Sequence, residues 1–170
     1  MSTPRFLIAG FVALILQGAL AQLGLPLVAL PQLMLLVVIG AAFSGSSVSG
    51  VISAFLLGIV LDLSSAVLVG PWAGAFVTVY AGLALVSQRL FLESGVVAAF
   101  VAFVAAIVAG TFFALLSPHS DLAALEHVIQ IFGQAAVTAA LAPWVVAAVA
   151  KPGQRRMATA ARNSSSLSAA

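Results

Sequence analysis

Asp62 is the residue of this chain whose type and position most suggest chemistry, because it follows a long run of apolar residues. A carboxylate at the centre of a membrane-spanning helix costs at least about 2.5 to 3.5 kcal/mol. Asp62 must therefore lie near an interface, face the protein interior or be protonated. Leu63, Ser64 and Ser65 follow it and offer amide and hydroxyl donors, which predicts a carboxylate held at a helix end. A proton-relay or ion-binding role is the alternative.

Other polar residues raise the question of catalysis. Ser49 lacks the preceding glycine of the Gly-x-Ser-Gly turn used by intramembrane serine proteases, and His127 is expected on the opposite membrane face. Asp121 could be paired with Asp62 as in an aspartyl peptidase, and His119, Asp121 and His127 could be combined as a metal site. We interpret these loop residues as the solvated end of a helix hairpin. The expectation is a protein that is not an enzyme and has no catalytic, cofactor-binding or metal-binding residues.

Small residues recur at every fourth position in two neighbouring segments. Such rows let helix backbones approach closely, which is how membrane helices pack against each other. One row comprises Ser46, Gly50, Ala54, Gly58 and Asp62, and the other comprises Gly70, Gly74, Thr78 and Gly82. We interpret both as packing faces within the monomer, with a dedicated homodimer face as the alternative.

The amino-acid composition indicates whether the chain folds in water or in a lipid bilayer. Of 170 residues, 64% are hydrophobic and only 6% are charged, whereas a soluble domain carries about 25% charged residues. A water-soluble domain is therefore excluded. The chain contains no cysteine, which removes disulfides and thiolate chemistry.

Glycine, proline, serine and charged residues divide the apolar sequence into six segments of helical length. They cover residues 6–23, 27–43, 48–61 or a turn or two further, 71–87, 95–116 and 127–150. The second and third are short for a straight span and are expected to be tilted, broken or partly re-entrant. The fold class predicted is an all-α membrane protein, a compact bundle of about six transmembrane helices over residues 1–150.

The charges predict an orientation, since Lys and Arg are retained on the cytoplasmic side. With six spans, every Lys and Arg falls on the side of the two termini, and Asp62, Asp121 and Glu126 fall on the other. Both termini are therefore predicted in the cytoplasm. Residues 151–170, basic and then rich in Ala and Ser, are expected to form a disordered tail. The first segment has some features of a signal peptide, but we interpret it as a retained span.

Several motifs resemble those of one family. Residues 58–65 (GIVLDLSS), followed by Leu68, Val69 and Gly70, resemble the glycine, Asp-Leu, Ser and Leu-Gly signature of the rod shape-determining protein MreD family. Residues 31–38 (PQLMLLVV) look like the opening of its second helix, and residues 89–94 (RLFLES) look like its basic cytoplasmic turn. The resemblance covers roughly residues 5 to 150.

The resemblance implies a non-enzymatic inner-membrane scaffold of the bacterial cell-elongation machinery. Such a protein binds the single-span protein MreC through its helices and helps couple an actin-like filament to peptidoglycan synthesis. The family's fold is similar to that of the substrate-binding membrane subunits of energy-coupling-factor vitamin transporters. That class is the alternative function, although it requires polar ligand anchors near the outer face, of which the sequence offers few.

Overall fold

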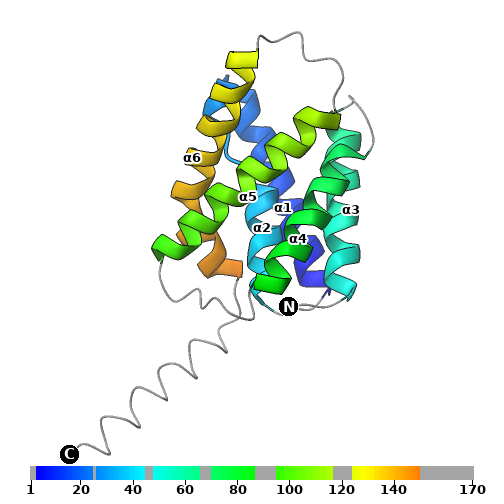
Figure 1. Ribbon diagram of the computed structural model, residues 1–170. Coiled ribbons are helices and arrows are strands. Elements are labelled where there is room, and N and C mark those ends of the chain that lie inside the picture. Colours follow the sequence, from blue (N-terminus) through cyan, green and yellow to red (C-terminus); the bar gives the residue numbers. More distant parts are fainter. Residues whose placement is uncertain are drawn as a thin grey trace, which may run out of the picture.

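The computed structural model describes residues 3–24, 26–44, 48–65, 70–86, 95–116 and 124–149. The regular secondary structure of this part of the chain is all helical, with no strand (Figure 1). Its elements are α1 (Thr3–Gln22), the 3-10 turn η1 (Leu27–Ala29), α2 (Leu33–Phe43), α3 (Val48–Ser65), α4 (Pro71–Val86), α5 (Gly95–Leu116) and α6 (Ala124–Val149).

Four of the six described α-helices are long and apolar enough to cross a membrane. The spanning stretches are Pro4–Gln22, Val48–Ser65, Gly95–Leu116 and Glu126–Ala148. At 1.5 Å per residue, α2 and α4 are only about 17 and 24 Å long, against about 30 Å of hydrocarbon. The expectation of an all-helical fold is thus confirmed for the described residues. Four of the six helices could cross a membrane, and the other two are too short to span by themselves.

Of the two segments predicted to be short, the second is short in the structure and the third is not. The second segment is broken as expected, because η1 and two prolines delay the start of α2. The third is not short, since α3 continues through Asp62 to Ser65 and has 18 residues. The fourth is short instead, because α4 begins at Pro71 and has 16 residues.

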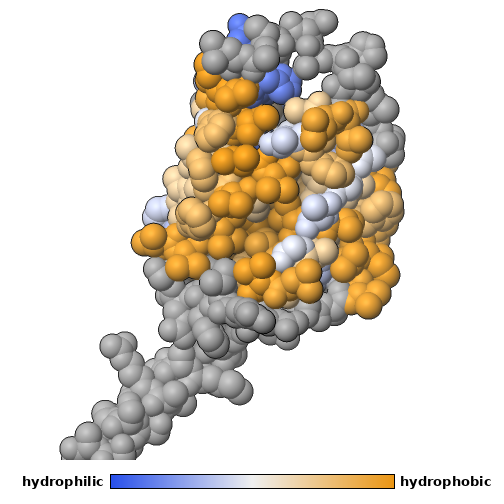
Figure 2. Space-filling model, in the orientation of Figure 1, coloured by the Kyte–Doolittle hydropathy of each residue, from blue (hydrophilic) through white to orange (hydrophobic). Residues whose placement is uncertain are grey.

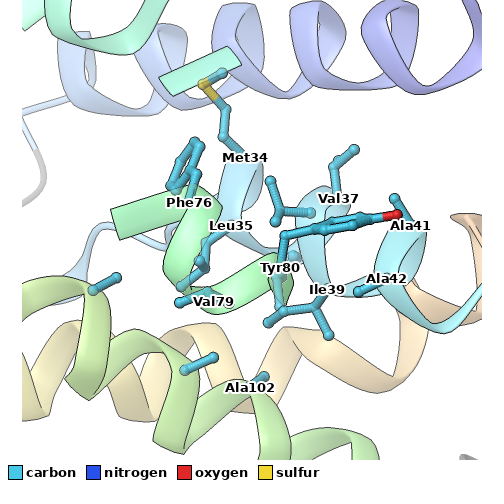
Figure 3. Close-up of a cluster of buried hydrophobic side chains, with 14 of the residues drawn as sticks. Met34, Leu35, Val37, Ile39, Ala41, Ala42, Phe76, Val79, Tyr80 and Ala102 are labelled. Carbon is cyan, nitrogen blue, oxygen red and sulfur yellow. The ribbon is translucent and has the colours of Figure 1, made fainter. Parts of the chain in front are cut away.

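Helix α2 forms the centre of the bundle. Every residue from Met34 to Ala42 is buried, and α2 contacts all five other helices. Figure 3 shows Phe76 and Tyr80 of α4 lying against it, both of them almost fully buried. A helix that is hydrophobic on all sides is stable in a protein core or in lipid, and the burial of α2 places it in the core of this bundle.

The remaining helices pack in pairs around α2 and turn large side chains outward. Helix α3 packs most extensively on α4, α5 packs on α6, and α1 covers α2 and α3. Large hydrophobic side chains are exposed on α1, α3, α5 and α6, and most of the face drawn in Figure 2 is hydrophobic. Such a surface is suited to contact with lipid.

Several sequence predictions concern residues outside the described part of the chain. These are Ser46 of the first small-residue row, Leu68 and Val69 of the Leu-Gly motif, the basic turn at residues 89–94, the loop residues His119 and Asp121, and the tail 151–170.

Candidate functional site

The carboxylate of Asp62 lies at the corner where α3 meets α4. Asp62 is 1% exposed, and its Oδ2 accepts hydrogen bonds from the backbone N–H of Gly70 at 2.9 Å and of Ala73 at 3.1 Å. Its Oδ1 accepts one from the N–H of Trp72 at 3.0 Å. The first N–H groups of a helix have no partner within that helix and carry its positive dipole end. Asp62 therefore caps the next helix in the chain.

The prediction that Leu63, Ser64 and Ser65 donate hydrogen bonds to the carboxylate of Asp62 was wrong. The hydroxyl of Ser64 donates to the carbonyl of Val60, and that of Ser65 donates to the backbone carbonyl of Asp62. Because α3 continues to Ser65, both hydroxyls donate hydrogen bonds to backbone carbonyls of their own helix. The carboxylate instead receives donors that lie eight to eleven residues further along the chain.

Gly58 lies one turn before Asp62 and faces the same first turn of α4. A Cβ atom at this position would lie 2.6 Å from the backbone N of Ala73 and 2.8 Å from the carbonyl O of Trp72. These are backbone atoms, so no side-chain rotation would relieve the contact. The glycine at 58 thus sets the distance at which the carboxylate of Asp62 reaches α4.

The rest of the α3 row continues along the same interface. Ala54 is fully buried, and a Cβ atom at Gly50 would overlap the ring of Tyr80, with the Cζ atom at 2.5 Å. Gly50, Ala54, Gly58 and Asp62 all lie on the face that α3 turns toward its neighbours, and Tyr80 and Ala73 of α4 are among the residues they meet. This row of small residues is therefore used for helix packing within the monomer.

The α4 row is divided. Gly70 precedes the helix with a φ of 129°, a conformation that favours glycine, and Gly74 accommodates the ring of Phe112 from α5. Thr78 and Gly82, in contrast, are exposed, and no described heavy atom lies within 4 Å of a Cβ built at Gly82. The second half of this row is therefore not used for packing within the described monomer.

Trp72 joins the corner to α5. Its ring stacks on Phe113 with centroids 5.0 Å apart and lies 5.9 Å from the ring of Phe76. Because the backbone N–H of Trp72 donates to Asp62, the cap and the aromatic contact fix the same residue. The start of α4 is thus held by α3 on one side and by α5 on the other.

Sequence reasoning missed a second polar contact, between the start of α2 and the middle of α6. The backbone N–H of Gln32 donates to Oγ1 of Thr138 at 3.0 Å, and its Nε2 donates to Oε1 of Gln134 at 3.1 Å. A signal was present, because His127, Gln130, Gln134 and Thr138 follow one another at spacings of three or four residues. Such spacing places them on one face of a helix.

The chemistry of the Asp62 corner is that of a structural cap. Both carboxylate oxygens are engaged by backbone donors, as expected for a carboxylate that stabilises a helix terminus. Within the described residues, no group of three His, Asp or Glu side chains is arranged to hold a metal ion. The combination of His119, Asp121 and His127 depends on residues outside that part.

Comparison with known proteins gives no relative: no protein-family model, no curated protein and no solved structure matches this chain.

Proposed function

We propose that this chain is a non-enzymatic, multi-pass scaffold subunit of the bacterial inner membrane, with both termini cytoplasmic, belonging to the cell-elongation machinery that builds peptidoglycan in rod-shaped cells. It binds a single-span partner similar to MreC through its helices. The proposal is supported by the MreD-like residues 58–65 and 68–70. Within the described part of this segment, Gly58, Asp62 and Gly70 lie at the corner between α3 and α4.

The observation that carries the binding role is the exposed small-residue face of α4, formed by Thr78, Ala81 and Gly82. In Figure 2 a pale band of intermediate hydropathy runs over α4 between hydrophobic neighbours. A glycine inside a helix costs about 1 kcal/mol relative to alanine. At Gly58 close packing offsets that cost, whereas at Gly82 the described monomer provides no neighbour within 4 Å. A second transmembrane helix in contact with this face would provide one.

The polarity of this face suits a membrane partner. The hydroxyl of Thr78 donates to the carbonyl of Gly74 at 2.8 Å, so it is satisfied without water. An approaching helix then meets a surface with short side chains and no unpaired donor at Thr78. Packing between such surfaces gains van der Waals contact that lipid tails do not reproduce.

Co-purification of the single-span partner tests this proposal. Gly82→Leu and Thr78→Leu place bulk on the α4 face and are expected to weaken binding by at least about tenfold, which corresponds to about 1.4 kcal/mol. Gly18→Leu is the matched control, because Gly18 of α1 is also exposed, with no heavy atom within 4 Å of a built Cβ, but belongs to no small-residue row. Equal recovery of the partner with all three variants would contradict the proposal.

Two other outcomes of the same experiment have distinct meanings. Self-association of differently tagged copies that Gly82→Leu abolishes would identify the face as a homodimer interface. A vitamin-like molecule that stays bound during extraction, found by mass spectrometry, would support the transporter-subunit function. The unpaired buried polar atoms Oε1 of Gln17, Oε1 of Gln32 and Nδ1 of His127 are the feature that favours this alternative.

A further inference from the structure

The side chain of Gln32 is buried between α2 and α6 with one polar atom unused. Gln32 is 8% exposed and donates through its backbone N–H and through Nε2 to Thr138 and Gln134. Its Oε1 has no hydrogen-bond partner. Inside a membrane domain, lipid offers no substitute for a missing partner, so a buried amide oxygen in this state is costly.

The first turn of α2 presents the complementary groups. Gln32 occupies the N-cap position, yet its side chain makes no capping hydrogen bond. The N–H of Leu33 donates to the carbonyl of Pro31 at 3.1 Å. Among the hydrogen bonds of the described residues, none pairs the N–H of Met34 or of Leu35. Both residues are almost completely buried, so bulk water does not reach these groups.

The length of the glutamine side chain explains the missing cap. Short N-cap side chains such as Asn or Ser place an oxygen on the second or third N–H of the helix, here those of Met34 and Leu35. The side chain of Gln32 is one methylene longer than that of Asn and is turned toward Gln134 on α6. One acceptor and two donors are thus left unpaired within a single turn of helix.

We propose that a single buried water molecule completes this N-cap by accepting a hydrogen bond from the N–H of Met34 or Leu35 and donating one to Oε1 of Gln32. Buried waters typically make about three hydrogen bonds to polar groups that have no other partner. Water can both donate and accept a hydrogen bond. It could therefore pair with the free end of the Gln32 amide in either orientation, whether that end is the acceptor Oε1 or the donor Nε2. The inference rests on these contacts alone and does not depend on the proposed function.

Nuclear magnetic resonance on the isotope-labelled full chain in lipid nanodiscs tests this site. Magnetisation transfer from long-lived water is expected at the amide of Met34 or Leu35. The amides of Val37 and Val38 serve as internal controls, because they lie deeper in the same helix and have intrahelical partners. Transfer at neither Met34 nor Leu35 would overturn the proposal.

A variant and a second measurement make the test specific. In Gln32→Asn the shorter side chain reaches the first turn directly, so the water signal at Met34 and Leu35 is expected to disappear while the remaining spectrum is retained. A signal that persists unchanged would show that Gln32 is not a partner of the water. A high-resolution structure of the natural chain in a lipid mesophase provides the second measurement. A water within hydrogen-bond distance of the Gln32 amide is expected, and a dry junction or a bound organic molecule would refute the assignment.

Discussion

At the scale of single residues, Asp62 shows how a carboxylate is accommodated in an apolar chain. Hydrogen bonds to a charged group contribute about 1.5 to 3 kcal/mol each, and Asp62 accepts three from one helix terminus. This gain is of the size needed to offset the cost of placing a carboxylate within a membrane helix. Asp62 is therefore expected to stabilise the corner between α3 and α4 rather than to react.

Replacing Asp62 tests this role through stability. Asp62→Ala leaves the N–H groups of Gly70, Trp72 and Ala73 unpaired, and we expect the free energy of unfolding to fall by more than about 2 kcal/mol. In Asp62→Asn one amide oxygen can still accept two of the three bonds, so a loss of about 1 kcal/mol is expected. Reversible unfolding in mixed detergent micelles measures both changes.

Ser64→Ala is the control for these substitutions. Ser64 lies in the same turn of α3, is exposed, and donates only to its own helix, so its loss is expected to change stability by less than about 0.5 kcal/mol. Equal losses for Asp62→Ala and Ser64→Ala would show that the cap does not stabilise the corner.

The sequence predicted part of this site and missed its central contact. The position of Asp62 near the end of an apolar run indicated a carboxylate at a helix terminus, and this is where it lies. Two of its donors, the N–H groups of Trp72 and Ala73, belong to α4, and the third is the N–H of Gly70 at the turn into α4, where φ is 129°. Such a turn depends on tertiary structure, which the spacing of Leu63, Ser64 and Ser65 does not encode.

At the scale of helices, composition alone could not distinguish a buried helix from one that contacts lipid. The segments of this chain are all apolar, so hydropathy rises in α2 as it does in α5, although α2 is surrounded by protein. Small-residue spacing was more informative, since the row on α3 marks the face that packs inside the monomer. The row on α4 has the same spacing but ends at an exposed glycine, and only the structure separates the two.

The contrast between the two rows leads to a prediction for matched glycine substitutions. Gly58→Ala forces a Cβ atom against backbone atoms of α4 and is expected to destabilise the protein by about 1 to 3 kcal/mol. Gly58→Leu should be worse, and more damaging than Asp62→Asn. Gly82→Ala has open space and improves helix propensity, so it is expected to leave stability unchanged or raise it by up to about 1 kcal/mol.

These variants are compared in the same micellar unfolding experiment as those of Asp62, without a partner present. If Gly58→Ala and Gly82→Ala have the same effect, close approach of α3 and α4 is not what requires glycine at position 58.

At the scale of the whole molecule, the distribution of charge predicts how the bundle lies in the membrane. Every Lys and Arg falls on the side of the two termini when all six segments cross the membrane in turn. Helices α2 and α4 are short, but α2 lies within the bundle and α4 packs between α3 and α5. Short helices covered in this way can still connect opposite faces, because neighbouring protein shields their ends.

The chain contains no cysteine, so single substitutions can report this orientation directly. We expect Ser120→Cys to react with a membrane-impermeant maleimide in intact cells, since the loop before α6 is predicted outside. Asn163→Cys, in the tail predicted to be cytoplasmic, should react only after the cells are permeabilised. Labelling of Asn163→Cys in intact cells would mean an odd number of crossings if the N-terminus stays inside. The positive charges would then no longer be gathered on one face, and the orientation predicted from them would be wrong.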